Sequence, residues 1–201
     1  MKNNRQTQVA RSATTREALI AAGRALFAAR GYAGVGTEEI VRAAGVSRGA
    51  LYHHFADKTE LFAAIFEAVE IDVIGRISAA IENAGLADPI AIMRLGASAW
   101  LDACIEPEIH QIGLLDAPAV LGLARWREIG ARYSMGMVEK LLTHAIAVGR
   151  LAPQPVKPLA QLLLGMVREG ALYLASAADK MQARRDVGGA IDRMIEALGT
   201  G

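Results

Sequence analysis

Apolar residues recur every three or four positions along most of this chain, which is the spacing of helices rather than of strands. Runs in which Val, Ile or Thr alternate with polar residues are absent after residue 13, and Ala, Leu, Glu and Arg dominate. The most regular stripe joins residues four apart: Leu61, Ile65, Val69, Val73, Ile77 and Ile81. These positions lie on one face of a long helix, so we predict an all-α protein.

Capping residues and glycines mark where the first helices begin and end. Thr14-Thr-Arg-Glu17 matches a capping box, and Gly31 ends the helix that this box opens. Thr37 and Ser47 are the expected N-caps of two short helices that follow. Asp57-Lys-Thr-Glu60 is a second capping box, and it begins the long helix that carries the regular apolar stripe.

Prolines divide the rest of the chain. Asp88-Pro89, Pro107 and Asp116-Ala-Pro118 each begin a predicted helix, because proline fits the first helical turn, and the last of these helices reaches Gly149. The segment Leu151–Pro158 contains three prolines, which are excluded from helix interiors, so we expect a loop there. Two final helices are predicted over about 158–178 and 184–198.

Charge divides the chain into two parts of opposite sign. Residues 1–58 carry nine Lys and Arg and four Asp and Glu, a net charge of +5, whereas residues 59–201 carry thirteen and seventeen, a net charge of −4. A basic head on an acidic body suggests that the head meets a polyanion, although chance clustering of solvated charges would give the same count. We therefore divide the chain into a head, residues 1–58, with a flexible basic arm over 1–13, and a body, residues 59–201.

Composition argues against a membrane span and an internal disulfide. No apolar run approaches the roughly 20 residues that a membrane-spanning helix needs. The N-terminal residues MKNNRQTQVARSATT have no hydrophobic stretch behind their charges, unlike a secretory signal. The single cysteine, Cys104, has no partner for an internal disulfide, which fits a reducing compartment. We expect a cytoplasmic protein that has no membrane partner.

Residues 37–55, TEEIVRAAGVSRGALYHHF, have the spacing of a helix-turn-helix. Ile40, Ala44, Val46 and Leu51 fall on the inner side, and Gly45 permits the reversal between the helices. The outer face of the second helix then carries side chains suited to DNA. An arginine there can donate two hydrogen bonds to guanine, while hydroxyl, imidazole and helix N–H groups can donate to phosphate. The predicted DNA-contacting residues are Thr37, Ser47, Arg48, Gly49, Tyr52, His53 and Lys58.

From Thr15 to about Phe66 the chain resembles the DNA-binding domain of the TetR/AcrR-type bacterial repressors. The matching features are FAARGY at the end of the first helix, then T-x-x-I-x-x-A-A-G-V-S-x-G-x-L-Y-x-H-F, then D-K-x-E-L-F. The resemblance implies an all-α homodimeric repressor with an N-terminal three-helix DNA-binding domain and a larger helical domain for ligand sensing and dimerisation. Its implied partners are double-stranded operator DNA and a small apolar effector, and the sequence identifies neither the operator nor the effector.

Bulky and polarisable side chains stand out in the Ala- and Leu-rich body, and we predict that they line the ligand pocket. They lie on one face of each of three helices: Trp100 and Cys104; Trp126, Tyr133 and Met137; Met166, Glu169 and Tyr173. Glu169 and the tyrosine hydroxyls would anchor polar groups of the ligand. Two alternatives stay open: such residues also fit a plain core, and Glu169 with its neighbour Arg168 also fits a surface edge.

The last two predicted helices are the candidates for the dimer interface, because four such helices from two chains can form a bundle. Two apolar stripes follow them: Leu159, Leu163, Met166, Gly170, Leu174 and Ala177 on the first, and Ile191, Ile195 and Leu198 on the second. The alternative is that both stripes face the core of their own chain.

Two other classes of protein share parts of this pattern. A helix-turn-helix protein without a small-molecule ligand, either architectural or regulated by a protein partner, would have the same head and a body without a cavity. An enzyme would need a nucleophile and a base, and Cys104 with His110 is the one such pair close in sequence. No nucleophile elbow, phosphate-binding loop or metal-ligand cluster accompanies that pair. We therefore expect no catalytic activity, no metal and no cofactor.

Overall fold

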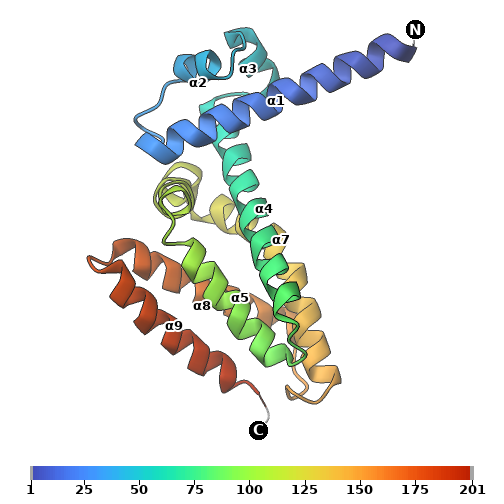
Figure 1. Ribbon diagram of the computed structural model, residues 1–201, viewed down its shortest axis with the longest axis vertical. Coiled ribbons are helices and arrows are strands. Elements are labelled where there is room, and N and C mark those ends of the chain that lie inside the picture. Colours follow the sequence, from blue (N-terminus) through green and yellow to red (C-terminus); the bar gives the residue numbers. More distant parts are fainter. Residues whose placement is uncertain (1, 200–201) are drawn as a thin grey trace.

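The computed structural model describes residues 2–199, with side chains from Ser12 onward, and the regular elements of this part of the chain are all helices (Figure 1). In chain order they are α1 (Lys2–Arg30), α2 (Thr37–Ala43), α3 (Arg48–His54), α4 (Lys58–Ala84), α5 (Pro89–Ala103), α6 (Pro107–Ile109), the π-helix η1 (His110–Asp116), α7 (Ala117–Ala147), α8 (Val156–Ser176) and α9 (Lys180–Glu196). The all-α prediction is confirmed. None of these helices combines the length and the apolar composition that crossing a membrane requires.

The head is a three-helix domain formed by α1, α2 and α3, which meet the start of α4 at one end of the molecule (Figure 1). Its core takes one or more fully buried side chains from each of these four helices: Leu19, Phe27, Ile40, Leu51 and Phe62. The rings of Phe27 and Phe62 pack edge to face, with their centres 5.4 Å apart. Because Ile40 and Leu51 point inward as predicted, the opposite face of α3 is left at the surface.

Several predicted helix boundaries in the head are confirmed. The Ser47 hydroxyl caps α3 by accepting a hydrogen bond from Ala50 N at 3.1 Å. The Asp57 carboxylate caps α4 in the same way, accepting from Glu60 N at 2.9 Å. Gly31 follows the last residue of α1 with a φ of 70°, a conformation that glycine adopts readily.

Two predicted N-caps are wrong. The cap of α2 is Gly36, and Thr37 is the first helical residue rather than the cap. Thr14 lies inside α1 instead of capping it, because no Gly or Pro interrupts the helix before this position. The basic arm predicted over 1–13 falls mainly on residues 1–11, whose side chains lie outside the described part of the chain.

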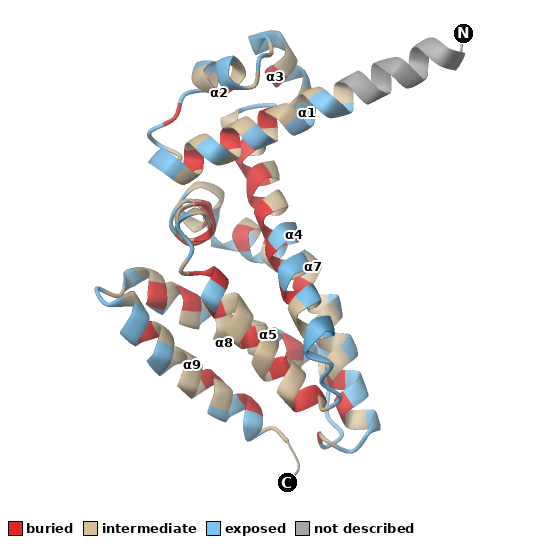
Figure 2. Cartoon of the chain, viewed as in Figure 1, coloured by how far each residue is buried: buried red, intermediate tan, exposed pale blue. Residues whose placement is uncertain are grey.

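The helix α4 connects the head to the body. Its predicted apolar stripe is buried from Leu61 to Ile77 and half-buried at Ile81, and the buried positions form the red band along this helix in Figure 2. In the body α4 packs against α5 and α7, while α8 packs on α7 and α9 packs on α5 and α8.

Between α5 and α8 lie three helical elements, α6, η1 and α7, which follow one another directly with no loop between them. The first, α6, begins at Pro107 as predicted and continues through η1 into α7. Gly122 interrupts α7 with a φ of 76°, which lies in the region that favours glycine. The last two helices start earlier than predicted. Pro158 fits the first turn of α8, which begins at Val156, and Asp179 caps α9, which begins at Lys180.

The two stripes predicted for the dimer interface face the core of their own chain. Leu174, Ile191 and Ile195 are buried, and five further members pack against the same cluster: Leu159, Leu163, Met166, Ala177 and Leu198. A Cβ atom on Gly170 would lie only 2.7 Å from Val187 of α9, so this glycine permits the close approach of α8 and α9. Within this chain α5, α8 and α9 use these residues to bind one another, as in the alternative that both stripes face the core of their own chain.

Candidate nucleic-acid interface and ligand cavity

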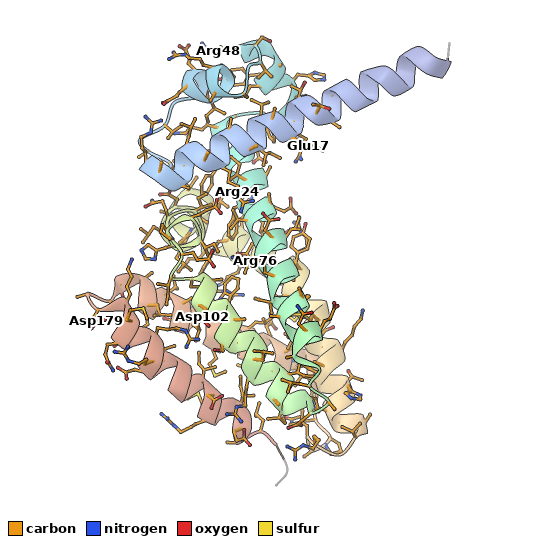
Figure 3. All side chains as sticks on the ribbon, in the orientation of Figure 1. Glu17, Arg24, Arg48, Arg76, Asp102 and Asp179 are labelled. Atoms are coloured by element: carbon orange, nitrogen blue, oxygen red, sulfur yellow. The ribbon has the colours of Figure 1, made fainter. Side chains whose placement is uncertain are left out.

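The outer face of α3 is exposed at the end of the molecule remote from α9, where Figure 3 labels Arg48. The side chain of Arg48 is 64% exposed. Five of the predicted DNA-contacting residues lie exposed together on α3 and its N-cap: Ser47, Arg48, Gly49, Tyr52 and His53. Thr37, at the start of α2, is half-buried. The turn at Gly45, with a φ of 66°, sets the direction in which α3 leaves α2.

Arg48 makes two contacts within the head, and both are weak. Its Nη1 lies 3.1 Å from Glu38 Oε1, and its guanidinium carbon lies 5.6 Å from the centre of the Tyr52 ring. Because both partners of the ion pair are more than 60% exposed, solvent screens most of their attraction. Arg48 can therefore exchange Glu38 for another hydrogen-bond acceptor at little cost.

Lys58, predicted as a cation on the same surface, is partly buried and hydrogen-bonded within the head. Its Nζ donates a 2.6 Å hydrogen bond to Tyr32 O and lies 3.9 Å from the centre of the Tyr32 ring. Partial burial lowers the pKa of the Lys58 amine. One of the three N–H donors of this amine is therefore used inside the head, and its partial burial makes Lys58 less available to a phosphate than an exposed lysine would be. The sequence did not suggest the contact because Tyr32 lies in the loop after α1, 26 residues earlier.

Charged groups hold the head against the body on the side of α6 and η1. Arg24 of α1, labelled in Figure 3, donates to Glu108 of α6 at 2.7 and 2.8 Å and also contacts Asp72 of α4. The backbone N of Tyr32 donates to Asp116 of η1 at 2.8 Å. The end of α1 is therefore joined directly to the segment that precedes α7.

A second set of ion pairs joins α7 to the first half of α4. Arg125 binds Glu60 with two hydrogen bonds of 2.6 and 2.8 Å, and Arg132 binds Glu67 at 2.6 Å. Tyr133 also donates to Glu67, at 2.6 Å, and this hydrogen bond lowers the pKa of the Glu67 carboxyl. A shift of α7 would consequently be transmitted to the part of α4 that lies next to the head.

A cavity of about 530 Å³ lies in the body between α4, α5, α7 and α8 and is partly open to the surface. This volume is in the range of small-molecule sites. Along α4 its lining extends from Phe66 to Glu82, a distance of roughly 24 Å at the helical rise. The lining is mainly apolar: Ile74, Ile77, Ile81, Ile92, Met93, Ala97, Trp100, Trp126, Met137, Val138, Leu141, Leu163, Leu164 and Val167.

Glu70 is the charged residue that lines this cavity and is buried. It is 5% exposed, and no hydrogen bond or ion pair reaches its carboxylate from the described residues. Burial raises the pKa of Glu70 to about 7, and the nearby Arg168 guanidinium opposes that rise. The sequence analysis missed this residue, although a signal was present: Glu70 interrupts a second apolar stripe of α4 between Phe66 and Ile74.

Arg168 of α8 lines the same cavity and lies 5.6 Å from the Trp126 ring. Burial lowers the pKa of the Arg168 guanidinium, and the charge of Arg127 acts in the same direction. The indole Nε1 of Trp126 donates a 3.0 Å hydrogen bond to Gly113 O in η1. The cavity wall therefore contacts the same π-helix that binds the end of α1.

Three of the residues predicted for the pocket line the cavity: Trp100, Trp126 and Met137. The other five do not. Cys104 is buried in the core, Tyr133 is hydrogen-bonded to Glu67, Met166 packs in the α8–α9 core, and Glu169 and Tyr173 are exposed. The rotation of α8 explains three of these errors. Its cavity face carries Leu163, Leu164, Val167 and Arg168.

Cys104 and His110, the pair considered for catalysis, are not arranged for it. Burial raises the pKa of the Cys104 thiol far above its ordinary value, which disfavours the nucleophilic thiolate. His110 Nε2 lies 3.0 Å from Lys180 Nζ. In the part of the chain that the structure describes, no group of three His, Cys, Asp or Glu side chains could hold a metal ion.

Sequence models of two protein domains match this chain. Residues 19–65 match the model described as bacterial regulatory proteins, tetR family. Residues 90–198, more than half of the chain, match the model described as tetracyclin repressor-like, C-terminal domain.

Individual proteins resemble the chain over nearly its whole length. The transposon Tn10 TetC protein of Escherichia coli is 26% identical over 180 residues, which are 88% of this chain and 90% of that protein. A TetR-family transcriptional regulator from Pectobacterium atrosepticum is 30% identical, with a TM-score of 0.84 over 96% of this chain and 97% of that one. The structure of RolR with the ligand resorcinol shares the fold, with a TM-score of 0.72 and 20% identity over 92% of this chain and 89% of that one.

Proposed function

Because this chain belongs to the tetR family of bacterial regulatory proteins, which bind DNA to regulate transcription, we propose that it is a repressor released from a palindromic operator by a small, mainly apolar molecule. The family consists of regulators rather than enzymes, so the alternative in which Cys104 and His110 form a catalytic pair is wrong. The observation that carries the proposal is the large apolar cavity in the body, since a helix-turn-helix protein without a ligand has no use for one.

In this proposal α3 enters the major groove of the operator. Arg48 leaves Glu38 and donates two hydrogen bonds to a guanine, while Tyr52 contacts a thymine methyl group or a phosphate. The hydroxyl of Ser47, which accepts the capping hydrogen bond from Ala50 N, still has a proton to donate to phosphate. Thr37, Gly49 and His53 lie close enough in the fold to complete the contact surface.

Operator fragments selected from a random DNA pool by the purified protein would test this surface. Arg48→Ala should relax the base preference and weaken binding by roughly 1–3 kcal/mol. Arg127→Ala, which removes an exposed arginine of α7, is the matched control and should leave both unchanged. If Arg48→Ala binds the selected operator at wild-type strength, α3 is not the reading helix.

We further propose that two chains form a homodimer, because one head buries too little surface for typical specific affinity. Two heads related by a two-fold axis would read half-sites about 34–36 Å apart. Since the predicted stripes are used inside the chain, the interface is assigned to the outer faces of α8 and α9. These faces carry the exposed apolar side chains Leu162, Tyr173, Met181 and Met194, which are 72%, 59%, 58% and 59% exposed.

Sedimentation measures this assembly directly. Tyr173→Glu should shift the protein to the monomer, because the partner would have to bury an unpaired charge. Val148→Glu places the same charge on an exposed residue at the end of α7 and should leave the dimer intact. A monomeric wild-type protein would contradict the assembly.

Release of DNA follows from linkage between the two sites. Some molecules will bind the cavity more tightly when the two heads are spaced wrongly for the operator. Such a molecule weakens operator binding by a certain factor, and operator DNA weakens the binding of the molecule by the same factor. The route we propose begins at Trp126 and reaches the head through η1 and α4. RolR, whose fold this chain shares, is bound to resorcinol in its structure, which supports starting with small aromatic molecules. If no compound shifts either the melting temperature or the operator affinity, the ligand-free alternative is favoured.

A further inference from the structure

We infer that the end of the cavity nearest the head selects its ligand through a hydroxyl group, which donates a hydrogen bond to the Glu70 carboxylate and accepts one from the Arg168 guanidinium. The apolar wall would hold the aromatic or aliphatic body of the same molecule. The ligand is thus assigned to the class of hydrophobic phenols and alcohols. This inference rests on the proposed function, because it names the class of molecule that the proposed sensor site binds.

The Glu70 carboxylate is the polar group that this ligand would satisfy. It is 5% exposed, lines the cavity, and lacks a hydrogen-bond partner among the described residues. Space is left in front of it by α7, where the position of a Cβ atom on Gly130 would be 3.6 Å from Glu70 Oε2. Its oxygen atoms are reachable from the cavity, since no fully buried side-chain oxygen among the described residues lacks a hydrogen-bond partner. A largely desolvated carboxylate without a protein donor is unfavourable, so a donor brought by the ligand gains what the protein itself does not supply.

One positively charged group, the Arg168 guanidinium, lies near Glu70, and it makes no direct contact with the carboxylate. Arg168 of α8 acts on Glu70 through space, and Cys104 at the end of α5 is the other titratable group close enough to interact with its charge. Glu70 and Arg168 form no ion pair within 4.0 Å, and the Arg168 guanidinium lies over Trp126 instead. The helix α7 faces Glu70 with Gly130, which carries no side chain. One acceptor and several guanidinium donors therefore line the same space.

A hydroxyl fits this pair better than other polar groups do. It can donate one hydrogen bond and accept another at once. An ammonium group would satisfy Glu70 but would be repelled by Arg168, and a carboxylate would be attracted by Arg168 but repelled by ionised Glu70. An ether can accept from Arg168 but has no proton for Glu70. The rings of Phe66, Trp100 and Trp126 line the cavity too, which favours a hydroxyl carried on an aromatic ring.

Four probes that share a body and differ at one end can separate these classes. They are 4-hexylphenol, 4-hexylanisole, 4-hexylbenzoate and 4-hexylbenzylammonium, and quenching of the fluorescence of Trp100 and Trp126 reports their binding. Full-length protein at pH 8 should bind the phenol about 10- to 100-fold more tightly than the anisole, as expected for a hydrogen bond to a charged group. The benzoate and the benzylammonium should both bind more weakly than the phenol.

Three substitutions on α4 assign the preference to Glu70. Glu70→Leu should abolish the difference between the phenol and the anisole, whereas Glu70→Gln, which keeps an acceptor oxygen, should retain part of it. Glu67→Gln changes a carboxylate one turn earlier that does not line the cavity, and it should leave the difference at its wild-type value. Between pH 6 and 8 the wild-type preference should rise as Glu70 loses its proton, and the preference of Glu70→Gln should stay constant.

Several results would overturn the inference. They are equal binding of the phenol and the anisole, tighter binding of the benzoate or the benzylammonium, an unchanged preference in Glu70→Leu, or no binding of any probe. Operator release is measured separately, by adding the probe to the complex with selected DNA. If the phenol binds with the expected preference but leaves the DNA bound, the inference stands and the proposed function fails. If a probe releases the DNA without any preference for the hydroxyl, the proposed function stands and the inference fails.

Discussion

Replacement of Glu70 by Gln should stabilise the protein, and the gain should grow with pH. In the folded chain burial raises the pKa of this carboxyl to about 7, from an ordinary value of 4.5. Below pH 4.5 both the folded and the unfolded chain hold the proton. Between the two values the folded chain alone holds it, so the free energy of unfolding falls as pH rises. Above pH 7 the folded chain carries a buried, unpaired carboxylate.

A difference of this size in the pKa of one carboxyl corresponds to roughly 3 kcal/mol. Glutamine has nearly the same shape and does not titrate, so the variant lacks this loss. The difference in the free energy of unfolding between Glu70→Gln and the wild type should therefore be about 3 kcal/mol larger at pH 8 than near pH 4.5. Urea denaturation of both proteins at four pH values from 5 to 8, at one protein concentration, measures most of this window.

The matched control is Glu67→Gln, one turn earlier on the same helix. The hydrogen bond from Tyr133 lowers the pKa of Glu67, so its stabilising effect is present above pH 4.5 and is lost as pH falls through the lowered value. Glu67→Gln should accordingly destabilise the protein at neutral pH, the opposite sign to Glu70→Gln. A difference between Glu70→Gln and the wild type that is constant from pH 5 to 8 would refute the reasoning, because Glu70 would then ionise alike in both states.

Four further substitutions test contacts that the structure assigns. Lys58→Met removes the hydrogen bond to a backbone oxygen and the cation–π contact, so it should lower the free energy of unfolding by roughly 1–2 kcal/mol. Lys157→Met, at an exposed lysine, is the control and should leave stability unchanged. Equal melting temperatures of Lys58→Met and the wild type would contradict the contact. Asp57→Ala and Asp179→Ala each remove an N-cap of 2.9 Å and should each cost about 1 kcal/mol. Only the first should also weaken operator binding in a DNA titration, because it loosens the start of α4. Gly170→Ala should destabilise by roughly 1–3 kcal/mol in urea, since its methyl group would lie 2.7 Å from a valine of α9; a stabilised variant would show that α8 and α9 can separate freely.

The head could be predicted from the sequence because its signals are local. The cap at Ser47, the turn at Gly45 and the inward positions of Ile40 and Leu51 lie within twelve residues of one another, and each signal leaves few alternatives. The contact between Lys58 and Tyr32 is different in kind. It joins a residue before α2 to a residue after α3, and neither residue type suggests such a contact from its sequence neighbours alone.

The cavity could be predicted only in part because it depends on how the body helices are rotated. On α8 the predicted residues Met166 and Tyr173 lie on roughly the opposite side of the helix from Val167 and Arg168, which line the cavity. Apolar residues occur on both sides of that helix, so its pattern does not distinguish the two faces. Glu70 was more accessible to sequence analysis, since it is the charged residue in an apolar stripe of α4. Its burial, however, requires α7 and α8 to cover it, and no local pattern indicates that.

One helix, α4, begins at the cap next to α3 and lines the cavity further along, and this arrangement constrains how such a regulator can evolve. A substitution at Ile74 or Ile77 that reshapes the cavity also acts on the helix that positions the head. Cavity residues on α5 and α8 shape the cavity but do not lie on the helix that positions the head. In a population selected for response to a new effector, accepted substitutions should therefore accumulate at positions such as Ile92 and Leu164. The effector could then diversify while the operator sequence is retained. Related regulators that respond to different effectors would in that case still compete for the same operator DNA.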